Sequence, residues 1–188
     1  MEQQETIYWA IVRIIRKRSE RGQVAQPKEI LSEIMEQGLL KSEDSGDRSH
    51  FETALKEAVE KNEDIKEISG SDGIPCYYSA LSLSETYVRI LIQKKENPLS
   101  LMAEIVRENS SIYPRPVPLD IFKESPFDFT QDELLVCLKI MGEQREYQDI
   151  VQTITSIGTI FLYSTQHLEP DYASSLAEWL DVGQVNNP

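Results

Sequence analysis

The spacing of apolar residues predicts helices at the start of the chain. Over residues 2–20 the isoleucines recur at three- and four-residue intervals, the period of one buried face of an amphipathic helix. The predicted stripe consists of Ile7, Ile11, Ile14 and Ile15, widened by Trp9 and Val12. A second, shorter helix is expected from Gln26-Pro27, because proline suits the first helical turn, to Gly38.

A third helix is predicted after a polar loop over residues 41–48. Ser49 and Glu52 fit the S-x-x-E capping box, in which the two side chains satisfy free amide groups at a helix start. The core stripe of this helix is then Phe51, Leu55, Ala58 and Val59. From Asp64 the apolar period shortens, and residues 65–69 and 74–80 read as two strands joined by a Gly-Ser-Asp-Gly turn.

The same order of elements occurs again downstream. Asn97-Pro98 is expected to open a helix with Leu101, Met102, Ile105 and Val106 on one face. Residues 116–123 form a short second helix, and Thr130 with Glu133 repeats the capping box before a third helix that runs to residue 144. Residues 150–155 and 159–164 are expected to pair as a second hairpin.

The two hairpins also share residues. A shift of 85 positions gives seven identities among the twenty positions from 64 to 83. They are Asp64/Asp149, Ile65/Ile150, Ser71/Ser156, Gly73/Gly158, Tyr78/Tyr163, Ser79/Ser164 and Leu83/Leu168. We favour duplication of one structural unit. Two unrelated hairpins with similar turn chemistry are the alternative.

Three helices followed by a hairpin, twice, resemble the tandem winged-helix proteins over about residues 2–168. The resemblance is one of architecture, and no family signature assigns functional residues. It implies a mainly helical α+β chain with two winged-helix domains, at residues 1–83 and 98–168. Proteins of this kind include DNA-binding regulators and acidic scaffolds similar to accessory subunits of bacterial condensins or endosomal sorting complexes.

Two further segments lie outside this repeat. Residues 84–97 are expected to be a linker helix, with a strand as the alternative because of Val88, Ile90 and Ile92. Residues 169–182 are expected to form a C-terminal amphipathic helix with Tyr172, Leu176, Trp179 and Leu180 on one side, a candidate protein interface. The tail, residues 183–188, is expected to be flexible.

The charge of the third helices distinguishes the two classes of function, DNA-binding regulators and acidic scaffolds. The 188 residues include 19 basic and 32 acidic side chains, for a formal net charge of -13. In DNA-reading proteins of this type the third helix brings cations and amides to the bases. Here residues 49–64 and 130–149 each hold two cations against five carboxylates, a net charge of -3. Acidic third helices disfavour contact with phosphates.

One basic cluster remains, at the end of the first helix. It consists of Arg13, Arg16, Lys17, Arg18 and Arg21. Cations there complement the helix dipole, so a solvated helix end explains the cluster. The functional alternative is contact with an anionic partner, either a nucleic-acid backbone or an acidic protein.

The sequence offers little for catalysis. Cys76 and Cys137 are far apart among apolar neighbours, and His50 and His167 lack nucleophile or carboxylate partners at a recognisable spacing. Glycine-rich phosphate loops are absent. We therefore expect a non-enzyme without cofactor, metal or small-molecule substrate. With neither a signal peptide's apolar centre nor a membrane-spanning run, we place it in the cytoplasm.

The sequence thus favours a non-catalytic protein–protein interaction or scaffold protein, which could be a homodimer. The alternative is a DNA-binding transcriptional regulator that uses the basic end of the first helix. A third, weaker class is an enzyme whose site is assembled from residues distant in sequence.

Overall fold

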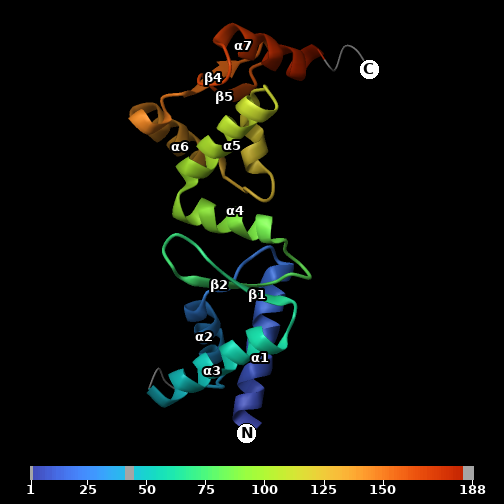
Figure 1. Ribbon diagram of the computed structural model, residues 1–188, viewed down its shortest axis with the longest axis vertical. Helices are drawn as coiled ribbons and strands as arrows, with labels where there is room; N and C mark the ends of the chain where they lie inside the picture. The colour runs from blue at the N-terminus through green and yellow to red at the C-terminus, as the bar shows by residue number, and fades with distance from the viewer. Residues whose placement is uncertain (1, 41–44, 184–188) are drawn as a thin grey trace. The chain divides into compact units, whose positions relative to one another are not determined.

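The computed structural model describes residues 2–40 and 45–183, which divide into two compact units, Met1–Ile92 and Gln93–Pro188 (Figure 1). Seven α-helices and two small antiparallel sheets make up the described residues. The prediction of a mainly helical α+β chain is therefore confirmed.

The first unit contains α1 (Glu2–Glu20), α2 (Pro27–Glu36), α3 (Ser45–Lys61), β1 (Ile65–Ser69), β2 (Pro75–Ser79) and α4 (Glu85–Glu96). The predicted isoleucine stripe of α1 is buried and shares one core with the apolar face of α3. Trp9 is an exception, with 55% of its surface exposed. Position 9 lies two residues from both Ile7 and Ile11, about 200° of helical rotation from each, and so falls on the opposite face of the helix.

The start of α3 differs from the prediction. The helix begins at Ser45, so Ser49 lies one turn inside it and does not cap it. The Glu52 carboxylate instead accepts a hydrogen bond of 3.2 Å from Arg48, one turn earlier. Asp47 lies in the first turn, where a negative charge favours the helix dipole and so supports the earlier start. Residues 41–44 of the predicted loop lie outside the described residues.

The hairpin of the first unit is covered on both sides. The strands pair in antiparallel register from Ile65 with Ser79 to Ser69 with Pro75, and Ala25 adds a short bridge to Tyr77. On the side away from the main core, Val88 and Ile92 of α4 pack with Cys76, Tyr78 and Leu83. The strand alternative for residues 84–97 is thus wrong. The helix there packs on the first unit through Val88 and Ile92, and the boundary between the two units falls within it, after Ile92.

The second unit contains α5 (Pro98–Ile112), β3 (Val117–Pro118), α6 (Gln131–Glu143), β4 (Ile150–Ile154), β5 (Ile160–Ser164) and α7 (Pro170–Glu178). Short helical turns complete it: η1 (Leu119–Lys123), η2 (Arg145–Tyr147) and η3 (Trp179–Gly183). The predicted second helix is the 3₁₀ turn η1, because β3 occupies the residues before it. The capping box at Thr130 is confirmed: its hydroxyl accepts from the Glu133 amide at 3.2 Å.

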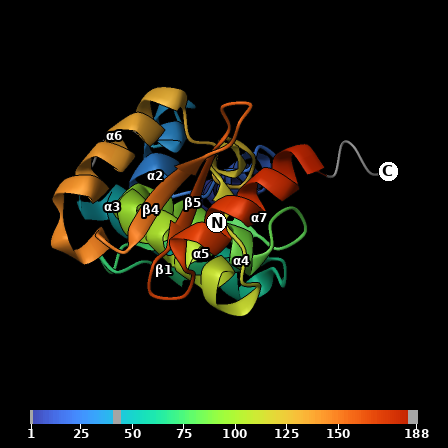
Figure 2. The same ribbon diagram turned by 90° about the horizontal axis from the view of Figure 1, so that it is seen from above.

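The three-stranded sheet of the second unit has the order β3-β5-β4. α7 lies along β4 and β5 (Figure 2), where Ala173 is buried with Tyr163 and Leu168. These three positions correspond to Val88, Tyr78 and Leu83 at the shift of 85, so α4 and α7 cover their hairpins in the same way. Residues 184–188 of the predicted tail lie outside the described residues.

Within residues 2–40 and 45–183, no helix combines the length and apolar character needed to span a membrane.

Candidate functional site

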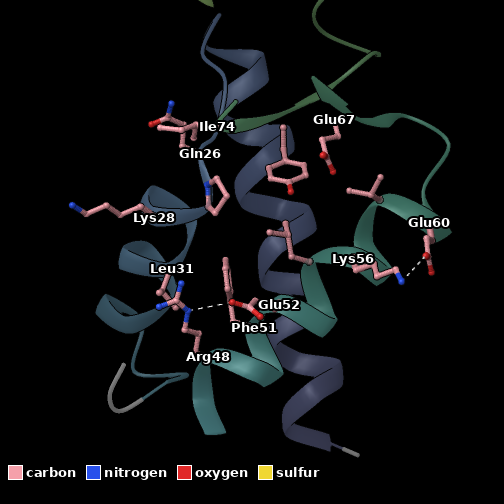
Figure 3. A pocket seen from close by; sticks show the side chains of 14 residues that line it. Gln26, Lys28, Leu31, Arg48, Phe51, Glu52, Lys56, Glu60, Glu67 and Ile74 are labelled. Carbon is pink, nitrogen blue, oxygen red and sulfur yellow. Dashed lines mark hydrogen bonds and ion pairs between the residues drawn. The ribbon is translucent and has the colours of Figure 1, made fainter. Parts of the chain in front are cut away.

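A groove of about 850 Å³ opens between α2, α3 and the hairpin of the first unit (Figure 3). The floor of the groove is apolar because part of it is the apolar face of α3, which also packs into the core of the first unit. The apolar lining consists of Pro27 and Leu31 from α2, Phe51, Leu55 and Val59 from α3, and Ile74 and Tyr77 from the hairpin. Cavities of this size and character are typical of binding sites.

Tyr77 closes the hairpin end of the groove. Burial, reinforced by the neighbouring Glu67 carboxylate, raises the pKa of Tyr77 to about 12. The phenol therefore stays protonated at neutral pH, and its hydroxyl is hydrogen-bonded to Glu67. Tyr77 is a fixed polar end to an otherwise apolar floor.

The charged rim of the groove is electrically balanced. Arg48 pairs with Glu52 at 3.2 Å and Lys56 with Glu60 at 3.8 Å, both along α3. The remaining charged lining residues are Lys28 and Glu67. A balanced rim on a chain of net charge -13 makes this groove a less acidic region than the sequence as a whole would suggest.

The predicted basic cluster lies at the C-terminal end of α1. Three of its five members, Arg13, Arg16 and Arg18, donate side-chain hydrogen bonds to other residues of the same unit. Arg18 donates to Glu29 at 2.9 Å and Glu33 at 2.7 Å, and Arg13 donates to Gln37 at 2.9 Å. In the described part of the chain only two members, Lys17 and Arg21, have neither an ion pair nor a side-chain hydrogen bond. The five residues do not form one free cationic patch.

Arg16, the fifth member, joins α1 to the hairpin. Its Nε and Nη2 donate to the two Asp64 carboxylate oxygens at 2.9 and 2.7 Å. The Ser79 hydroxyl also donates to Asp64, at 2.8 Å, while the Ser79 amide donates to the Ser19 hydroxyl at 2.8 Å. The Arg16 guanidinium and the Ser79 hydroxyl together lower the pKa of Asp64 to about 2.

The second unit contains the same network at Arg107, Asp149, Ser164 and Ser110. Arg107 donates twice to Asp149, Ser164 donates its hydroxyl to Asp149, and the Ser164 amide donates to Ser110. The pKa of Asp149 is likewise lowered, chiefly by the Arg107 guanidinium. Sequence comparison at a shift of 85 found the aspartates and serines of the hairpins. It missed the R-x-x-S pair of α1 and α5, because these helices are related by a shift of 91.

Only part of the predicted C-terminal interface is exposed in the structure. Tyr172 and Trp179 are 53% and 56% exposed, whereas Leu176 and Leu180 are half-buried. The residues that face the hairpin are the small Ala173 and Ala177. Polar contacts hold the helix there: Thr155 donates to Asp181 at 2.6 Å, Thr153 and Ser174 share a hydrogen bond of 2.9 Å, and Ser156 donates to Glu178.

A second surface missed by the sequence analysis lies on α6. Leu135 and Val136 are 52% and 57% exposed, between the acidic first turn at Asp132 and the exposed Lys139. The buried stripe of α6 consists of Leu134, Cys137 and Met141, so two apolar residues are left on its outer side. A helical-wheel plot of residues 131–143 would have revealed them.

Neither thiol nor imidazole forms a cluster with other reactive groups. Cys76 and Cys137 are buried and are not disulfide-bonded, and burial raises the pKa of Cys137. His50 and His167 are exposed. No three His, Cys, Asp or Glu side chains come together as a possible metal site within the described ranges.

Comparison with known proteins relates mainly the second unit to a family. Residues 95–185 match the YdhW C-terminal domain, nearly the same range as the unit Gln93–Pro188. The chain is also similar to Uncharacterized protein YdhW of Escherichia coli (strain K12), with 29% identity over 139 residues, 72% of this chain. The match covers 65% of that relative, just under two thirds of its length. No solved structure matches the chain.

Proposed function

We propose that this chain is a non-catalytic protein that binds other proteins through two duplicated winged-helix units. Three observations support the architecture. Each unit runs helix, short strand or bridge, second helix, third helix, hairpin, where the second helix is α2 in the first unit and the 3₁₀ turn η1 in the second. Each closes its hairpin with the same arginine–aspartate–serine network, and each covers it with a fourth helix.

The observation that carries the function is the surface chemistry of the third helices. α3 borders an apolar groove whose rim cations Arg48 and Lys56 are paired with its own carboxylates. α6 exposes Leu135 and Val136 beside acidic residues. A helix that reads DNA instead offers free arginine, lysine, asparagine or glutamine to base edges. Exposed apolar residues with a charged border are typical of protein interfaces.

A DNA-binding regulator is the alternative, and the ion pairs of α1 weigh against it. Arg16 and Arg18 are hydrogen-bonded to carboxylates of their own unit. In α5 the positions equivalent to Arg13 and Lys17 are Glu104 and Glu108, so the second unit lacks a comparable cluster. We also propose a cytoplasmic location, since the two cysteines are not joined in a disulfide.

Affinity capture from the native cell, with and without nuclease, tests the proposal. We expect one stoichiometric partner protein in both samples, and its loss in a Leu135→Asp, Val136→Asp variant. Leu81→Asp is the matched control, because Leu81 is also an exposed leucine. Recovery only through nucleic acid would reject the proposal.

Binding of random duplex DNA gives the opposing test. At physiological salt we expect it to be weaker than the non-specific range of about 10⁻⁴–10⁻⁶ M. Tight, salt-sensitive binding that is lost in Lys17→Glu, Arg21→Glu would instead favour the regulator. These two cations are the appropriate targets, because they are not used in ion pairs within the described part of the chain.

A further inference from the structure

We propose that the groove between α2 and α3 receives α7 of a second copy of this chain. The inference rests on the proposed function, since it names one protein partner for that surface. The proposed contact joins an apolar groove in the first unit of one copy to an exposed helix face in the second unit of the other. No element of the described part of the chain covers either surface.

The exposed face of α7 has the spacing of a helix that docks in a groove. Tyr172 and Leu176 of α7 and Trp179, the first residue of η3, occupy positions i, i+4 and i+7, the anchor pattern of amphipathic helices bound in apolar grooves. Ala173 and Ala177 hold the adjacent face against the hairpin. α7 can therefore present its aromatic residues to a partner without leaving its own unit.

The groove matches this face in length and chemistry. Phe51, Leu55 and Val59 lie at i, i+4 and i+8 along one side of α3, a stripe of about 12 Å at 1.5 Å per residue. The seven-residue separation of Tyr172 and Trp179 corresponds to about 10 Å on the same scale. Leu31 faces the α3 stripe from α2, so the two large aromatic side chains would meet apolar walls on both sides.

Charge favours an acidic occupant over a basic one on the α2 side of the groove. Lys28 and the Arg48–Glu52 ion pair lie on that side, and the Lys56–Glu60 ion pair and Glu67 lie opposite (Figure 3), so Lys28 supplies the net positive charge on the α2 side. Residues 169–183 carry four carboxylates and no cation. Of these, Glu178 and Asp181 bind hydroxyls of the hairpin turn, whereas Asp171 is exposed at the start of the helix. A second copy thus supplies an apolar helix face with an exposed carboxylate, Asp171, for Lys28.

In a two-fold symmetric dimer this contact forms twice, because each copy contributes one groove and one helix. The assembly then closes at two copies.

Sedimentation equilibrium of the full chain over a concentration series is the first test. We expect a reversible monomer–dimer equilibrium. A Tyr172→Ser, Trp179→Ser variant and a Lys28→Glu variant should each raise the dimer dissociation constant at least about tenfold, or about 1.4 kcal/mol. Ile157→Ser is the control, since Ile157 is a similarly exposed apolar residue of the second unit, and its dissociation constant should not change.

Mixing the variants identifies the contacting surfaces. The Tyr172→Ser, Trp179→Ser variant retains an intact groove, and the Lys28→Glu variant retains an intact helix face. A mixture of the two should therefore dimerise more tightly than either variant alone. A chain that stays monomeric throughout, a dimer indifferent to both variants, or a mixture no tighter than its components would overturn the proposal. Captured partner protein that is lost with Leu135→Asp, Val136→Asp in the same preparation would still support the proposed function, so the two failures are distinguishable.

Discussion

Arg107 and Asp149 face each other through two parallel hydrogen bonds, Nε to Oδ2 at 2.9 Å and Nη2 to Oδ1 at 2.6 Å. The pair links α5 to the start of the hairpin, 42 residues later in the chain. Arg16 and Asp64 make the same two bonds in the first unit, at 2.9 and 2.7 Å. Each pair orients a hairpin against the first helix of its own unit, so we expect it to matter for stability.

Asp149→Asn should destabilise the second unit by about 2 kcal/mol. The Asp149 side chain is only 8% exposed, and the substitution leaves the Arg107 charge without its counter-ion in a partly buried site. Urea unfolding followed by circular dichroism measures the change. Glu85→Gln, which removes the exposed pair with Arg89, should cost less than about 0.5 kcal/mol. Equal effects of the two substitutions would contradict the assigned role of Asp149.

Acid should weaken the first unit through Asp64. Its pKa falls from 3.8 to about 2 on folding, so the carboxylate contributes stability above the unfolded pKa. That contribution, about 2 kcal/mol, is lost as the pH falls from about 5 towards 2. The free energy of unfolding, measured against pH, should fall less steeply over this window in Asp64→Asn than in the unmodified chain. Parallel pH profiles would show that Asp64 titrates normally in the folded protein.

Replacing the glycine in the turn of the second hairpin should destabilise the protein. Gly158 has φ +93°, and open space surrounds the position of a Cβ, so Gly158→Ala is strained by the backbone alone. We expect a loss of about 1 kcal/mol. Gly142 lies within α6 at an ordinary helical φ and also has open space, so Gly142→Ala should stabilise by about 0.5–1 kcal/mol. Thermal unfolding should therefore shift in opposite directions for the two variants.

Substitutions on the two faces of α7 should have different effects on the stability of the second unit. Ala177 is buried against the hairpin, so Ala177→Asp should destabilise the second unit by more than about 2 kcal/mol, because it buries a charge without a partner. Tyr172→Ser, on the exposed face, should change stability by less than about 0.5 kcal/mol. Differential scanning calorimetry of both variants makes the comparison. A large loss from Tyr172→Ser would mean that its ring supports the fold.

Local patterns in the sequence determined most of the elements. The isoleucine spacing predicted α1, the Thr130–Glu133 box predicted the start of α6, and β1 was predicted with its observed bounds. These signals work because helix and strand periods and capping bonds involve residues close together in the chain. At α3 the Ser49–Glu52 box predicted a start one turn later than the observed Ser45, so a local capping pattern was wrong there.

Only the tertiary structure decided which charges and faces are free. Arg16 meets a carboxylate 48 residues away, so a cluster of five cations at the end of α1 leaves few of them for a partner. α4 proved to be the fourth helix of its unit because Val88 and Ile92 bury against the hairpin. The small Ala173 and Ala177, rather than the large aromatic residues, face the hairpin beneath α7. Spacing shows that residues share a face, but packing against distant residues determines whether that face is covered.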